Sequence, residues 1–191
     1  MRLCFGIRRC GTSHRQRFSG AALPESDSWL TPLGAVPVET ELRDALVGEK
    51  GAFHADDGVH QEEHSLEVQL PFLQTLFPDF TIVPLLVGGA TPEEVAAVLA
   101  RLWNGPETRI VISSDLSHYH DGRTARRQDD ETAATIVALR PERLRDDAAC
   151  GREAIAGLLL EARRHAMTAA AVDLRHSGDT GGPSDRVVGY G

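Results

Sequence analysis

Residues 81–103 read TIVPLLVGGATPEEVAAVLARLW, and this stretch decides the fold. Residues 81–87 are apolar and rich in β-branched side chains, which predicts a buried strand that ends at the following pair of glycines. Thr91 is suited to cap a helix and Pro92 to occupy its first turn, so a helix is expected from there to Trp103. A strand followed directly by a helix is a building unit of α/β proteins.

The same alternation extends in both directions along the chain. Pro71 lies inside a stretch with apolar residues at helical spacing, so a kink or a break is expected near Leu70. The chain therefore predicts one α/β domain spanning residues 1–191, with a mixed or mostly parallel central sheet flanked by helices. The further strands are expected at residues 3–7, 109–113, 168–172 and 186–190, and the further helices at 39–47, 63–77, 124–139 and 150–165.

The composition is that of a globular protein with an acidic surface. Hydrophobic residues make up 41% of the chain, and 28 acidic against 20 basic residues give a formal net charge of -8. This charge argues against nucleic acid and anionic membranes as partners, and no apolar run approaches the roughly 18 residues of a bilayer span. One basic cluster, Arg123, Arg126 and Arg127, is followed by acidic residues and is interpreted as a solvated helix face.

The three cysteines, Cys4, Cys10 and Cys150, are odd in number and match neither a zinc knuckle nor a CxxC pair. The basic N-terminus lacks the long apolar stretch and the cleavage site of a signal peptide. Both observations predict a reducing, cytoplasmic location.

Polar residues follow two of the expected strands, at GTSH (11–14) and SDLSH (114–118). Ligand-binding groups of open α/β sheets gather beyond the carboxyl ends of strands. His14 is a candidate metal ligand or proton shuttle, with an ordinary surface histidine as the alternative. His118 is a candidate ligand or general acid, and Asp115 either orients it or caps a short helix.

Cys150 stands at the start of the helix expected at residues 150–165. A helix N-terminus favours negative charge, and Arg152 adds to this effect, so a thiolate is favoured there. A thiolate is a soft metal ligand or a nucleophile. The alternative is a buried, inert cysteine.

Residues 60–64 read HQEEH and match the H-x-x-E-H pattern of inverted zinc metallopeptidases, in which two histidines one helical turn apart hold zinc. The firm helical pattern begins only near Glu63, however. The alternative is that His64 alone faces a pocket. Neither GxGxxG nor GxxxxGK occurs, so no nucleotide cofactor is expected.

Several stretches together resemble the Memo-like family, whose bacterial and archaeal members include AmmeMemoRadiSam system protein B. They follow the family's order and cover nearly the whole chain. The matching stretches are GTSHRQRFSGAAL (11–23), TPLGAVPVE (31–39), EEHSLEVQLPFLQ (62–74), ISSDLSHYH (112–120), CGREAIAGLLL (150–160) and HSGDTGGPSDRVVGYG (176–191).

The resemblance implies a fold similar to the catalytic subunits of class III extradiol dioxygenases, with a cysteine in place of the metal-binding carboxylate. By motif, His14 matches a metal histidine and Cys150 the cysteine ligand, whereas His64, Asp115 and His118 match catalytic or pocket-lining positions. Mixed His and Cys ligands favour iron or copper over zinc. A PHAG-type motif that supplies another metal histidine in the family is not found in this chain, which suggests truncation at the N-terminus.

The resulting expectation is a metal-dependent protein with redox or dioxygenase-like chemistry on an unknown small molecule. The alternative is a non-catalytic binding or adaptor protein that retains the pocket. Its expected partners are a small-molecule or peptide ligand, with a homo-oligomer as a further possibility.

Overall fold

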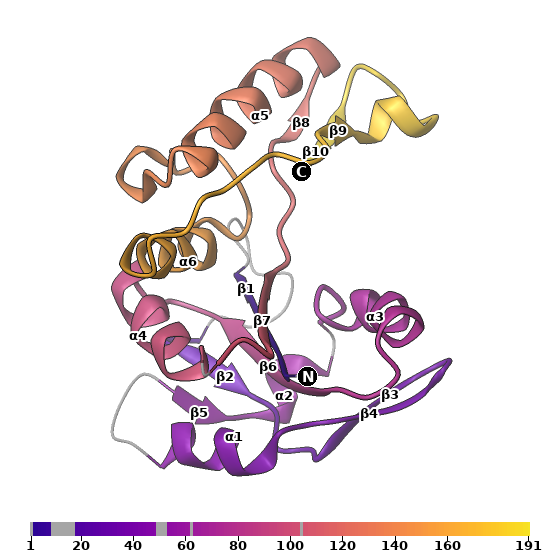
Figure 1. Cartoon of the computed structure of the whole chain (residues 1–191). Helices are drawn as coiled ribbons and strands as arrows, with labels where there is room; N and C mark the ends of the chain where they lie inside the picture. Colours follow the sequence, from indigo (N-terminus) through magenta and orange to yellow (C-terminus); the bar gives the residue numbers. More distant parts are fainter. Residues whose placement is uncertain (1, 9–17, 49–52, 62, 104) are drawn as a thin grey trace.

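The computed structural model describes residues 2–8, 18–48, 53–61, 63–103 and 105–191. Its main sheet has five strands in the order β5-β2-β6-β1-β7 (Figure 1). Strand β1 pairs in parallel with β6 and β7, and β2 pairs in parallel with β5 but antiparallel with β6. The sheet is therefore mixed. Its strands are β1 (Arg2–Arg8), β2 (Ala21–Leu23), β5 (Phe53–Ala55), β6 (Thr81–Val87) and β7 (Thr108–Ile112).

Two smaller sheets accompany the main one. A hairpin is formed by β3 (Ser28–Thr31) and β4 (Gly34–Pro37), which are joined by a turn at Pro32 and Leu33. An antiparallel sheet in the order β8-β10-β9 gathers short strands near the C-terminus. These strands are β8 (His118–His120), β9 (Arg175–His176) and β10 (Val187–Tyr190).

Helices cover the sheets, and none in the described residues is long and apolar enough to cross a bilayer. The α-helices are α1 (Thr40–Val47), α2 (Asp57–His60), α3 (Leu70–Leu76), α4 (Pro92–Leu102), α5 (Gly122–Val137) and α6 (Arg152–Arg164). The short 3₁₀ helices are η1 (Glu67–Gln69), η2 (Pro141–Arg143) and η3 (Ser177–Thr180).

Strand β6 lies in the middle of the main sheet and divides the core. Side chains of a strand alternate between its two faces. Val83, Leu85 and Val87 pack with α1, α4 and α6 in one apolar cluster, whereas Ile82 and Leu86 pack in a second cluster with β4, α2 and α3. Because both faces are covered, the strand is apolar at nearly every position.

Helix α4 begins as its sequence predicts. The Thr91 hydroxyl accepts from the N–H of Glu94, and the Glu94 carboxylate accepts from the N–H of Thr91, which forms a capping box. Helix α6 packs closely on α4 at Gly157, where a Cβ atom would lie 2.5 Å from Val95 Cγ1. Only glycine allows this separation of the two helices.

Most of the expected elements are confirmed, including the break near Leu70, where η1 ends and α3 begins. Two predictions are wrong. The helix expected from Glu63 starts only at Glu67. The strand expected at residues 168–172 does not form: this segment has no regular structure and is almost entirely exposed, with Val172 at 96%.

Candidate functional site

Cys150 lies just before α6, and its sulfur rests against the backbone that follows β7. The N–H of Asp115 donates to Cys150 Sγ at 3.2 Å, and the N–H of Cys150 donates to the Asp115 carbonyl oxygen at 3.1 Å. This reciprocal pair joins residues 35 positions apart in the sequence. It fixes the sulfur beyond the carboxyl end of β7, an edge strand of the main sheet, at the end where α/β sheets place their ligand sites.

Ser114 completes the support of the sulfur. Its hydroxyl donates to the Asp115 carbonyl oxygen at 2.8 Å, accepts from the N–H of Gly151 at 2.8 Å, and lies 3.5 Å from Cys150 Sγ. A Cβ atom at position 151 would lie 2.9 Å from this hydroxyl oxygen. Glycine at the first turn of α6 therefore allows the helix to approach β7.

Asp115 also reaches the imidazole of His118. Their Oδ2 and Nε2 atoms are 3.5 Å apart, and the side chains are 48% and 32% exposed. The hydrogen bond with Asp115 raises the pKa of His118 above its usual value, although partial burial opposes this shift. The pair faces solvent on one side, so a proton can be exchanged with a ligand there.

A buried carboxylate holds the segment that carries His118. Asp129, only 2% exposed, accepts from the N–H of Ser117 at 2.9 Å through Oδ1. Gly189 of β10 packs against the same carboxylate, because a Cβ atom there would lie 2.0 Å from Asp129 Oδ2. Tyr119 follows His118 with a positive φ of 63°, and its ring lies 4.5 Å below the guanidinium of Arg186.

The structure thus brings together three of the five predicted site residues: Cys150 contacts Asp115, and Asp115 contacts His118. His64 is exposed near the start of η1, and no contact between its side chain and these three is seen in the described residues. His14 lies outside the described residues. Within the described part of the chain, no group of three His, Cys, Asp or Glu side chains is arranged to hold a metal ion.

The pattern His60-x-x-Glu63-His64 does not form a peptidase site. Helix α2 ends at His60, so the two histidines are not one turn apart on a single helix. The His60 ring is buried and its Nε2 lies 3.2 Å from the Ala22 carbonyl oxygen, whereas His64 is exposed. The interpretation of this stretch as a zinc site is wrong because the helix that the pattern requires stops at its first residue.

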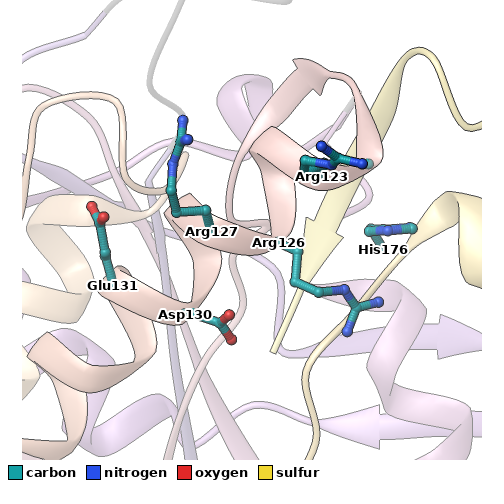
Figure 2. Close-up of a pocket in the computed structure, with 7 residues that line it drawn as sticks. Arg123, Arg126, Arg127, Asp130, Glu131 and His176 are labelled. Carbon is teal, nitrogen blue, oxygen red and sulfur yellow. The ribbon is translucent and has the colours of Figure 1, made fainter.

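Helix α5 borders a concave region of about 530 Å³ (Figure 2). Arg123, Arg126 and Arg127 are exposed there, as expected for a solvated helix face. Arg126 forms an ion pair with Asp179 at 2.9 Å. Asp130 and Glu131 lie on the same wall, so positive and negative charges nearly balance and the region has no marked preference for an anion.

The sequence reasoning did not single out Ser114 or Asp129 for their roles in the site. Asp129 is one of the acidic residues that follow the basic cluster of the expected solvated face, but it lies four residues after Ala125 and three before Thr132, which are both buried. This helical spacing is the signal that could have found it. Ser114 carries no comparable signal, because its contacts come from a residue far along the chain.

The fold and the site define an α/β protein in which three functional groups meet beyond strand β7. Asp115 contacts the Cys150 sulfur through its backbone N–H and the His118 imidazole through its carboxylate. The model of the family described as Memo-like protein matches residues 7–191, and this chain belongs to that family.

Relatives support this assignment. A MEMO1 family protein of Saccharolobus islandicus is 36% identical over 183 residues, which cover 89% of this chain and 64% of the relative. One from Methanosarcina barkeri is 36% identical over 178 residues, covering 86% and 66%, respectively. One from Thermoplasma volcanium is 33% identical over 190 residues, covering 94% and 70%. The chain thus spans about two thirds of the length of these relatives.

Proposed function

We propose that this Memo-like protein holds a metal ion with Cys150 and His14, and that it carries out redox or dioxygenase-like chemistry on a small molecule beside the Asp115–His118 pair. The observation that carries the proposal is the position of Cys150 Sγ, 3.2 Å from the N–H of Asp115. Asp115 in turn lies 3.5 Å from the His118 ring. Asp115 therefore contacts both Cys150, the proposed soft ligand, and His118, with which it forms the proposed acid/base pair.

The residues of the chain have distinct parts in this proposal. His118, whose pKa is raised by the hydrogen bond with Asp115, would exchange a proton with a ligand group, and Asp115 orients the ring. A bound iron or copper ion would supply oxygen or one-electron chemistry. The described residues contribute one ligand for it, Cys150, and do not form a complete metal site. The proposed role of the Asp115–His118 pair is proton exchange with the ligand alone.

The test is the metal content of protein purified without oxygen. His14→Ala and Cys150→Ala should each reduce the bound iron or copper to a small fraction of the wild-type amount. The metal is measured by elemental mass spectrometry. His165→Ala is the matched control, because His165 stacks on Trp103 and is not one of the proposed ligands. Unchanged metal content in both His14→Ala and Cys150→Ala would refute the proposal.

We also propose a cytoplasmic location, because a reducing compartment keeps a thiol such as that of Cys150 free. A small-molecule or peptide ligand of the pocket and association into a homo-oligomer remain part of the proposal.

A second candidate function is a binding or adaptor protein without catalysis. Exposed apolar side chains on the hairpin β3–β4 and on α3 favour it: Leu30 is 84% exposed, Phe72 is 72% and Leu76 is 70%. Such groups are typical of interaction surfaces. Oxygen consumption by metal-loaded protein with catechol-like or thiol substrates, lost in Cys150→Ala, would decide for the enzyme, and its absence would decide for the binding protein.

A further inference from the structure

The strand β8, next to β10 (Figure 1), carries a tyrosine with an unusual backbone conformation beside the proposed acid/base site. Tyr119 has a φ of 63°, which residues other than glycine rarely adopt. Its neighbours His118 and His120 pair with consecutive residues of β10, so Tyr119 is the extra residue of a β-bulge. A bulge redirects a side chain, and this one leaves the Tyr119 ring beside the His118 ring, with centroids 5.7 Å apart.

Arg186 comes from the neighbouring chain segment and covers the Tyr119 ring. The carbon at the centre of its guanidinium lies 4.5 Å from the centre of the ring. The backbone is fixed on both sides of Arg186. The carbonyl oxygen of Ser184 accepts from the N–H of Gly122 at 2.9 Å, and Val187, the first residue of β10, is fully buried. The guanidinium is therefore presented by an anchored segment.

Stacking on a ring leaves the donors of Arg186 available to a ligand. A guanidinium is planar: the contact with Tyr119 uses its face, whereas its N–H groups point outward in its plane. Arg186 is exposed and the Tyr119 side is open as well, at 62%. In the part of the chain that the structure describes, no carboxylate forms an ion pair with Arg186, and Asp115 is paired with His118. A planar fork of donors fits a carboxylate.

Tyr119 also determines how far the anion lies from the proposed chemistry. Its ring contacts the His118 ring and the Arg186 guanidinium, so these two groups are separated by one aromatic side chain. A ligand held at Arg186 reaches His118 if a spacer about as long as an aromatic ring joins its two ends. Holding the far end of a ligand in this way orients its reacting end.

We propose that Arg186 and Tyr119 select the ligand of this site, and that the ligand carries a carboxylate. The carboxylate binds in the plane of the Arg186 guanidinium, an apolar spacer lies against Tyr119, and the reacting group lies at the Asp115–His118 pair. The carboxylate belongs to a free small molecule or to the C-terminus of a peptide. This inference rests on the proposed function and names the class of its substrate.

The experiment measures the binding of benzoate to the full chain dialysed free of metal, by calorimetry and by NMR of the histidine ring protons. His118→Gln identifies the signal of His118. Benzoate should shift this signal with saturation at constant ionic strength. Benzamide, which has nearly the same shape without the charge, should not. Because no metal is added, the result is separate from the metal content that tests Cys150.

Two pairs of variants locate the binding. Arg186→Gln should weaken benzoate binding about fivefold to tenfold, whereas Arg127→Gln, which removes the same charge from the exposed face of α5, should leave it unchanged. Tyr119→Phe keeps the ring and should keep the affinity. Tyr119→Gly suits the positive φ, so it should weaken binding without lowering the thermal unfolding midpoint. A purely structural role of Tyr119 would lower the midpoint.

A short peptide that ends in phenylalanine distinguishes the two sources of the carboxylate. Tighter binding of this peptide than of benzoate, lost when its C-terminus is amidated, assigns the site to a peptide, and the reverse order assigns it to a small molecule. No saturable response to either ligand, an equal response to benzamide, or equal effects of Arg186→Gln and Arg127→Gln would overturn the inference. Benzoate binding together with unchanged metal content in His14→Ala and Cys150→Ala would uphold it and refute only the proposed metal chemistry.

Discussion

The main sheet and the small C-terminal sheet are held together by different forces. Strand β6 is apolar on both faces and lies between two clusters of buried aliphatic side chains. The sheet β8-β10-β9 depends largely on polar contacts: Asp129 accepts from Ser117, the Ser177 hydroxyl accepts from the N–H of Val188, and Asp179 accepts from the N–H of His176. The first provides stability, and the second positions His118. Mutations in the two sheets should therefore differ in how much they lower the free energy of unfolding and in whether they change the titration of His118.

Leu85→Ala should have the largest effect, because Leu85 is 1% exposed in the centre of β6. Its truncation should lower the free energy of unfolding by about 2–5 kcal/mol. The measurement is chemical denaturation followed by circular dichroism. Leu76→Ala, in an exposed position on α3, should change the free energy by less than about 0.5 kcal/mol. Equal effects would mean that the main sheet is not the stabilising region.

Gly189→Ala should have an intermediate effect of about 1–3 kcal/mol, because its Cβ atom would press on the buried Asp129 carboxylate. The loss should not add to that of Asp129→Ala, which makes room for the methyl group, and a double-mutant cycle on unfolding free energies measures this coupling. Gly89→Ala is the control, since its Cβ atom would meet neighbours only at 3.5 Å and beyond. Strict additivity would show that the two residues do not share the contact.

Asp115→Asn should have the smallest effect on stability and a clear one on titration. The hydrogen bond with Asp115 raises the folded-state pKa of His118 above the unfolded value. The resulting stabilisation is fully present below about pH 6.5, the unfolded pKa, and it disappears as the pH rises through the folded pKa. Asn should lower the His118 pKa, measured by NMR of the ring protons, and should flatten this pH dependence. An unchanged titration would remove Asp115 as the partner.

Where local signals are strong, the sequence alone predicts the elements well. The bounds of β6 are those expected, and α4 begins at Pro92 after its Thr91 cap, because a β-branched apolar run and a capping sequence act within a few residues. The strand expected at residues 168–172 fails for the opposite reason. A run of small apolar residues forms a strand only where a sheet edge pairs with it, and the sequence does not show whether such an edge is available.

The candidate site was predictable in its parts but not in its contacts. Asp115 and His118 were predictable because they follow an expected strand, and Cys150 was predictable because it stands at an expected helix start. That the sulfur meets the N–H of Asp115 depends on how α6 packs against β7, which no local pattern contains.

The close contact of α6 with α4 at Gly157 has a mechanical consequence for the sulfur. Gly157 lies seven residues after Cys150, about 10 Å along the helix axis. Any side chain there would collide with Val95 and push α6 sideways. Such a displacement would lengthen or break the hydrogen bonds at the start of the helix. The absence of a side chain at Gly157 therefore helps to keep the Cys150 thiol aligned with the end of β7.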